Sequence, residues 1–257
     1  METRLPLTIQ PQPDDTTCGP TCLQAIYAYY GDPVPLEQVI AEVPKLDGGG
    51  TLEVLLGLHA LGRGYQATIF SYNLHVFDPT WFTASGRARP GIEERLARQN
   101  EVKTDPKLLL TAGHYIEFLD RGGKIRFQDL TLEIMKGFLR RSIPILCGLS
   151  ATYLYRSARE HGPNSDFDDI RGEPTGHFVV VRGYSQSERK ALVADPLLPN
   201  PMAQSPMYEV SLSHLNCAIM LGIVTFDASL LIISPSASDA SSSSMPATRA
   251  MGASRAS

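Results

Sequence analysis

The chain has 257 residues, of which 43% are apolar and 19% are charged, so it has the composition and length of a globular protein with a substantial core. A formal net charge of −4 offers no electrostatic footprint for nucleic acid or for an anionic membrane surface. No apolar run approaches the ~20 residues that a bilayer-spanning helix needs, and four cysteines are too few for a disulfide scaffold. The first twelve residues lack the hydrophobic stretch of a secretory signal, so we expect a cytoplasmic protein.

The first part of the chain predicts mainly helices. Apolar residues recur at helical spacing from Cys18, Pro20 occupies the first turn, and Gly31 supplies a C-terminal stop near residue 30. The elements expected after it are a helix at 36–43, a helix at 51–61 that begins at Thr51 as a cap, and a strand at 65–72.

The middle of the chain, 73–128, has mixed signals. Aromatic residues cluster in a loop-like stretch, and a charged amphipathic helix is expected at 92–102. We interpret this region as an insertion that shapes one wall of a cleft.

The second half is richer in strands. The elements expected there are a helix at 131–141, a strand at 143–149, a helical stretch at 150–160, a loop at 161–175, a hairpin of strands 178–184 and 191–194, a helix at 212–220 and a strand at 230–233. A helical half followed by a strand-rich half favours an α+β fold over an alternating α/β fold. We expect one domain over 1–233, and a disordered tail over 234–257 because that segment is dominated by Ser and Ala.

Cys18 is the candidate nucleophile. The unpaired N–H groups and the dipole at a helix N-terminus favour the thiolate form of a cysteine, which is the reactive form. The polar residues before it are expected to leave the sulfur at an exposed corner, and Gly19 permits another backbone to approach closely. The Cys18 N–H and the side-chain amide of Gln12, on an extended approach, can both donate to an oxyanion. The alternative is that Cys18 is a small apolar residue at a helix start.

The other cysteines are expected to be packing residues. Cys22 lies one helical turn deeper than Cys18, and Cys147 and Cys217 lie within apolar stretches. No matching Cys/His pair occurs at ligand spacing elsewhere, so the sequence predicts no zinc site and no other cofactor.

His177 is the candidate base. It opens a predicted strand behind Gly176, whereas the other five histidines lie in contexts without a partner signal. Asp195 ends the antiparallel partner strand and is therefore expected beside His177, where it can accept the ring N–H and orient the imidazole. The alternative role for Asp195 is to start a turn before Pro196.

An acidic loop precedes His177. Its charged residues are Asp166, Asp168, Asp169 and Glu173. The loop either favours a basic or amino-terminal substrate group or is simply a solvated segment.

These motifs resemble the bacteriocin-leader (double-glycine) peptidases, a family of papain-like cysteine peptidases. The similar segments are Gln12 with Cys18-Gly19-Pro20-Thr21-Cys22-Leu23, Gly176-His177-Phe178-Val179-Val180-Val181, and Val193-Ala194-Asp195-Pro196, in this order. The resemblance implies a papain-like α+β fold, with a nucleophile-bearing N-terminal helix packed on an antiparallel sheet. It also implies that Cys18 is the nucleophile, His177 the base, Asp195 the orienting residue and Gln12 the oxyanion donor. The family module usually precedes a membrane transporter; none follows here, so a stand-alone form is expected.

The function predicted from the sequence is hydrolysis of a peptide or small amide through a Cys18 thioester. Two alternatives remain open at this point. The same thioester can be passed to an amine, which makes an acyltransferase or transpeptidase, or the chain can be a non-catalytic peptide-binding module.

Overall fold

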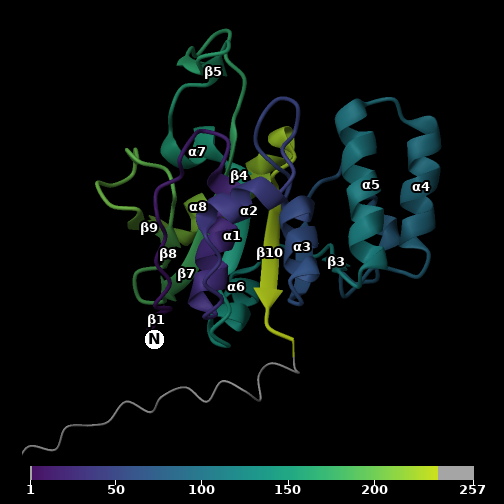
Figure 1. Ribbon diagram of the computed structural model, residues 1–257, viewed down its shortest axis with the longest axis horizontal. Helices are drawn as coiled ribbons and strands as arrows, with labels where there is room; N and C mark the ends of the chain where they lie inside the picture. The colour runs from purple at the N-terminus through teal and green to yellow at the C-terminus, as the bar shows by residue number, and fades with distance from the viewer. Residues whose placement is uncertain (1, 237–257) are drawn as a thin grey trace, which may run out of the picture.

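A mixed sheet of eight strands forms the centre of the computed structural model, which describes residues 2–236 (Figure 1). Its strands are β1 (Glu2–Arg4), β2 (Gln66–Ser71), β3 (Lys124–Arg126), β4 (Ile145–Ser150), β7 (Gly176–Ser185), β8 (Lys190–Ala194), β9 (Met207–Ser211) and β10 (Ser229–Ser234). Their order is β3-β2-β10-β4-β7-β8-β9, with β1 added beside the end of β7. Every pairing in this sheet is antiparallel except that of β2 with β3.

Helices cover both faces of the sheet (Figure 1). They are α1 (Cys18–Tyr29), α2 (Leu36–Glu42), α3 (Glu53–Gly62), α4 (Ile92–Val102), α5 (Pro106–Asp120), α6 (Leu132–Leu139), α7 (Ala151–Tyr155) and α8 (Leu212–Leu221), with 3-10 turns η1 (Pro79–Trp81) and η2 (Gly222–Thr225). A short hairpin of β5 (Glu160–His161) and β6 (Asp166–Phe167) stands apart from the sheet. No helix within residues 2–236 is both long and apolar enough to cross a membrane.

Strand β7 separates two cores. Phe178 and Val180 face the core built on α1, α3 and α5, whereas Val179 and Val181 face the core built on α6 and α8. Successive side chains of a strand point to opposite faces, so a strand buried on both faces is an unbroken apolar run. The α+β fold with an N-terminal helix packed on a mainly antiparallel sheet, predicted from the sequence, is confirmed.

Most of the predicted elements lie within two or three residues of the observed ones, but Thr51 does not cap α3. Its hydroxyl donates to the Pro44 carbonyl at 2.9 Å, and Leu52 occupies the cap position without a side-chain hydrogen bond. The elements that were not predicted include α5, the strand β9 with its alternating burial, the short strands β1 and β3, and the β5–β6 hairpin, which lies largely in the predicted loop.

The predicted insertion, 73–128, contains an antiparallel pair of helices, α4 and α5, beside α3 (Figure 1). A Cβ on Gly57 of α3 would lie 2.8 Å from a ring carbon of Phe118 of α5, so the glycine permits close packing of these helices. Helix α5 carries a sequence signal that the prediction overlooked: Asp105 caps it by accepting from the Leu108 N–H at 2.9 Å, and Pro106 occupies its first turn.

The domain limits remain predictions. Strand β10 ends at Ser234, the first residue of the predicted tail, and positions 237–257 of that tail lie outside the described residues.

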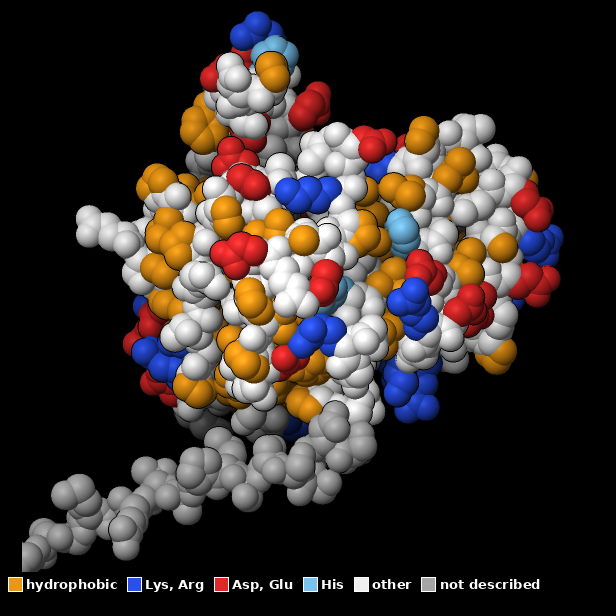
Figure 2. Space-filling model, viewed as in Figure 1, with side chains coloured by type: hydrophobic (Ala, Val, Ile, Leu, Met, Phe, Trp, Pro, Cys, Tyr) orange, Lys and Arg blue, Asp and Glu red, His pale blue; other side chains and the backbone are white. Residues whose placement is uncertain are grey.

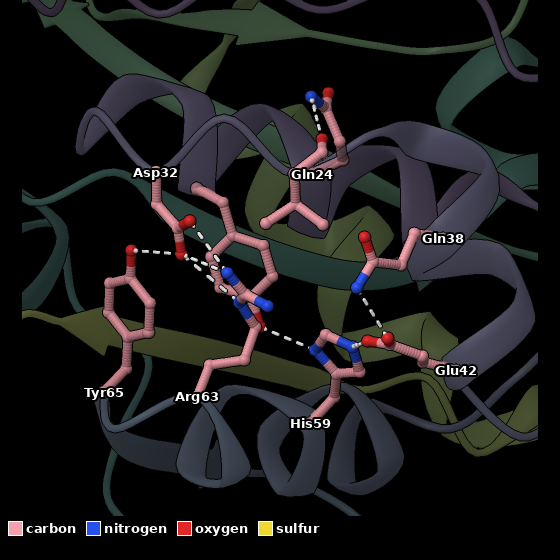
Figure 3. Close-up of polar contacts among 9 residues, drawn as sticks. Gln24, Asp32, Gln38, Glu42, His59, Arg63 and Tyr65 are labelled. Carbon is pink, nitrogen blue, oxygen red and sulfur yellow. Dashed lines mark hydrogen bonds and ion pairs between the residues drawn. The ribbon is translucent and has the colours of Figure 1, made fainter.

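A polar network ties α1, α2 and α3 together on the side away from the sheet (Figure 3). The Tyr27 hydroxyl and His59 Nδ1 lie 2.8 Å apart, and His59 Nε2 lies 2.9 Å from Glu42 Oε2. Beside them Arg63 pairs with both carboxylate oxygens of Asp32 and lies over the Tyr27 ring. Because the Tyr27 side chain is fully buried, this hydroxyl–imidazole–carboxylate series is a support for the helices and not an accessible reactive group.

The substitution Tyr27→Phe tests this role. It removes the hydroxyl and leaves His59, whose side chain is 7% exposed, without one of its two partners. An unpaired buried polar group costs about 1–3 kcal/mol, so the free energy of unfolding in urea should fall by that amount. Tyr153→Phe, at an exposed tyrosine, is the control and should change little. Equal urea midpoints for the two variants would contradict the assignment.

Candidate functional site

Cys18 begins helix α1 and lies against the sheet. The residue is 8% exposed, so the prediction of an exposed corner is wrong. The neighbour Gly19 shows why: a Cβ there would lie 2.7 Å from Thr51 Cγ2 and 3.2 Å from a ring carbon of Phe178. Side chains, and not a second backbone as expected, therefore close around the start of α1.

His177 and Asp195 meet at the end of the β7–β8 hairpin. His177 is the second residue of β7, and Asp195 directly follows β8. The distance from His177 Nε2 to Asp195 Oδ1 is 2.8 Å, and both side chains are buried. This bond uses Nε2 and leaves Nδ1 as the other ring nitrogen, and Cys18 is among the groups that raise the pKa of His177.

Two tyrosines that the sequence analysis missed hold the other oxygen of Asp195. The hydroxyls of Tyr155 in α7 and Tyr208 in β9 both donate to Oδ2 at 2.8 Å. The Leu197 N–H donates to Oδ1 at 3.0 Å. The carboxylate is thus fixed in place by groups from three separate parts of the fold, although no local sequence signal marked the tyrosines.

The electrostatics of the pair favour its charged form. Burial disfavours both charges, yet the charge of Asp195, with a contribution from Cys18, raises the pKa of His177 to about 10. In the same way, burial acts against the charge of Asp195, but His177 and the surrounding donors lower the pKa of that carboxyl to about 2. Burial and then the charge of Asp195 raise the pKa of the Tyr155 and Tyr208 hydroxyls, which remain donors.

Gln12 lies on the extended segment before α1 and is tied to the loop that follows Asp195. Its backbone N–H donates to the Pro196 carbonyl at 2.9 Å. Its Nε2 donates to the Asp14 carbonyl at 2.9 Å, while its buried Oε1 has no protein partner. One of the two Nε2 protons is therefore occupied, and the second remains for an acceptor.

A further buried acid, Asp227, lies next to His177 and was not predicted. A Cβ on Gly176 would lie 1.8 Å from Asp227 Oδ2, and a Cβ on Gly148 would lie 2.2 Å from the Asp227 carbonyl oxygen. The two glycines therefore make room for Asp227 across strands β4 and β7. Burial raises the pKa of Asp227 to about 7.

The predicted insertion contacts this acidic position. Lys107 of α5 donates to the Thr225 carbonyl at 3.0 Å and lies 4.8 Å from the centre of the Phe226 ring. The buried Glu53 of α3 accepts from the Tyr115 hydroxyl of α5, and burial raises the pKa of Glu53 to about 7. The charges of Glu53, Asp227 and Lys107 act on one another, so these residues form a second titratable cluster beside His177.

The remaining cysteines divide into two kinds. Cys22 and Cys147 are fully buried, as predicted, and the Cys22 thiol donates to the Phe178 carbonyl at 3.2 Å. The prediction that Cys217 is buried is wrong, because it lies on the outer side of α8 and is exposed. Its apolar neighbours in the sequence point inward, and the prediction wrongly extended their burial to Cys217.

The acidic loop before His177 forms a finger, residues 156–175, that carries β5 and β6 and stands clear of the body (Figures 1 and 2). Figure 2 shows acidic and basic side chains on it. Asp168 pairs with Arg171 at 2.6 Å, so one of the predicted acidic groups is neutralised within the finger itself. A preference for basic substrates stays a prediction.

Comparisons with known proteins give similar solved structures. A double-glycine-motif protease from an AMS/PCAT transporter, solved with its leader peptide, is 15% identical, with a TM-score of 0.43 over 91% of this chain and 95% of that one. A C39-like peptidase from Bacillus anthracis is 14% identical, with a TM-score of 0.46 over 92% and 98%. The peptidase domain of Streptococcus ComA, a bifunctional ABC transporter of a quorum-sensing pathway, is 12% identical, with a TM-score of 0.40 over 90% and 99%.

No family model and no curated protein matches the chain. The likeness to the solved structures is one of fold, and the residue roles proposed below rest on the geometry of this chain.

The titratable cluster predicts a pH dependence of stability. The pKa of Glu53 is about 7 in the folded protein and has an ordinary value of 4.5, so the native state binds more protons than the unfolded state between these values. Stability therefore falls as pH rises from about 4.5 to about 7, by on the order of 3 kcal/mol from this group alone.

Glu53→Gln removes this contribution while keeping the shape of the side chain. We expect the unfolding free energy of the variant to fall less between pH 4.5 and 7 than that of the wild type, as measured by urea titration. Glu94→Gln, at an exposed position of α4, should keep the wild-type slope. Parallel pH profiles for all three proteins would show that Glu53 is not the titrating group.

Proposed function

We propose that the protein is a cysteine peptidase or amidohydrolase in which Cys18, His177 and Asp195 form the catalytic series. The observation that carries this proposal is the buried 2.8 Å contact between His177 Nε2 and Asp195 Oδ1, with the Cys18 thiol among the groups that act on the imidazole. A cationic imidazole next to a thiol at a helix N-terminus is the arrangement that stabilises a thiolate–imidazolium pair.

In the proposed reaction the Cys18 thiolate attacks the carbonyl carbon of a peptide or amide bond. The carbonyl oxygen becomes an oxyanion, which the Cys18 N–H and the free Nε2 proton of Gln12 would stabilise. The His177 imidazolium gives its proton to the departing amine as the C–N bond breaks, which leaves a Cys18 thioester and a neutral imidazole.

Hydrolysis of the thioester reverses these roles. The neutral His177 takes a proton from water while the hydroxyl oxygen attacks the thioester carbon. The C–S bond then breaks, and the site returns to thiolate and imidazolium with release of the acid. Asp195 is not protonated in this cycle: Tyr155 and Tyr208 hold one of its oxygens, so the other stays aimed at His177.

Selective alkylation of Cys18 tests the thiolate–imidazolium pair. Iodoacetamide should label Cys18 rapidly and well below pH 8, because His177 remains protonated there with a pKa of about 10. In His177→Ala the labelling of Cys18 below pH 8 should slow by at least tenfold, as measured by mass spectrometry of the modified peptide.

The exposed Cys217 is the internal control, and its rate of labelling should be the same in both proteins. Labelling of Cys18 that is slow and unchanged in His177→Ala would favour a non-catalytic peptide-binding module.

A burst experiment with p-nitrophenyl acetate separates hydrolysis from acyl transfer. We expect about one equivalent of p-nitrophenol per protein in a fast phase, as the acetyl group moves to Cys18, followed by a slower turnover that releases acetate. Cys18→Ala should lose the burst, whereas Cys217→Ala should retain it.

Added glycine methyl ester reports the fate of the thioester. If acetate remains the main product, water is the acceptor and the hydrolase proposal stands. N-acetylglycine methyl ester as the main product would instead identify an acyltransferase with the same catalytic series.

A further inference from the structure

A cavity of about 160 Å³ lies between β1 and the β7–β9 part of the sheet, and one of its lining residues, Tyr208, also donates to Asp195 of the Cys18 site. Its walls include Arg4, Arg182, Leu192, Met207 and Glu209. Its volume corresponds to about five water molecules, which is enough for a small organic molecule.

A β-bulge places Arg182 at this cavity. Val181 pairs with Val193 and Gly183 pairs with Leu192, and these two partners are consecutive in β8. Arg182 is therefore an extra residue of β7 that has no partner of its own in β8. A bulge of this kind redirects a side chain that a regular strand would send to its alternate face. Gly183 completes the arrangement, because a Cβ there would lie 2.2 Å from the Thr3 carbonyl oxygen and would push β1, with Arg4, away.

The guanidinium of Arg182 is held in a fixed orientation. Its Nη1 donates to the carbonyls of Leu5 at 3.0 Å and Leu7 at 2.7 Å. These bonds use one nitrogen and leave the donors of Nε and Nη2 for a planar acceptor.

Arg182 brings to the cavity a positive charge that no ion pair within residues 2–236 offsets. Within the part of the chain that the structure describes, no carboxylate pairs with Arg182; burial and then the charge of Arg4 lower its pKa. Arg4 pairs at 3.3 Å with Glu2, but both side chains are more than half exposed, so that ion pair contributes little. The one acid in the wall, Glu209, pairs at 3.1 Å with Lys190, which also pairs at 3.0 Å with Glu188 outside the wall.

We propose that this cavity is a binding site for a small aliphatic carboxylate. Arg182 and Arg4 would receive the carboxylate, for which a guanidinium has a matched pair of donors. Leu192 and Met207 would contact the hydrocarbon part, which inorganic anions lack. This site does not depend on the catalytic series proposed for Cys18, and its test does not measure activity.

NMR titration of the full chain with 4-methylpentanoate tests the proposal. The Nε–Hε resonances of Arg4 and Arg182 should shift, with a dissociation constant of roughly 1–10 mM, as suits a ligand of few atoms. The neutral 4-methylpentanamide and inorganic phosphate should bind at least tenfold more weakly, because the first lacks the charge and the second lacks the hydrocarbon part.

Two variants locate the site. Arg4→Gln, at an exposed side chain, should fold normally and weaken 4-methylpentanoate binding at least tenfold. Arg182→Lys keeps the charge but loses the fork, and should weaken it by a similar factor. Arg98→Gln, at an exposed position of α4, is the control and should bind as the wild type does. The proposal is overturned if the arginine resonances do not shift, if the amide or phosphate binds equally well, or if Arg4→Gln binds normally.

Discussion

The buried carboxylate of Asp195 is the constraint on which the arrangement of the sheet edge depends. A fully buried carboxylate without partners would be strongly destabilising, so its oxygens must be matched by donors. The donors come from β7 (His177), α7 (Tyr155), β9 (Tyr208) and the turn after β8 (Leu197). Helix α7 must therefore lie over the end of the β7–β8 hairpin, and β9 must pair with β8 in the register observed.

Two buried acids near His177 have pKa values that shift in opposite directions for a physical reason. Asp195 accepts four hydrogen bonds and faces the imidazolium, so its pKa falls to about 2 despite its burial. Burial raises the pKa of Asp227 to about 7, with a contribution from the charge of Glu53, because the single Thr225 hydrogen bond and the charges of Lys107 and His177 do not offset it. Burial alone does not decide whether an acid is ionised; the number and charge of its donors do. The 73–128 region takes part in this balance, because Lys107 belongs to it.

The sequence predicts most of the fold because apolar periodicity determines which face of each element is buried. The helix at Cys18 and the strand after Gly176 are marked in this way, and both were placed within two residues. Tyr155, Tyr208 and Asp227 were not found, since each reaches the site only through the pairing of strands or packing of helices distant in sequence. Cys18 was expected at an exposed corner because no local pattern indicates that Thr51 and Phe178 pack against its neighbour Gly19.

The contact between His177 and Asp195 depends on a β-bulge in β7, which the prediction of a hairpin from the sequence does not include. From the turn, the register pairs Ser185 with Lys190 and Gly183 with Leu192, and a regular continuation would put Asp195 opposite Val180. Residues directly opposite each other point to the same face of the sheet, and Val180 faces the α1 side. His177 is an odd number of residues away from Val180, so its side chain points to the other face. The bulge at Arg182 shifts the register by one, so Asp195 falls opposite Val179, which shares its face with His177. The extra residue that turns a guanidinium toward the cavity at one end of β7 thus also aligns the carboxylate with the imidazole at the other end.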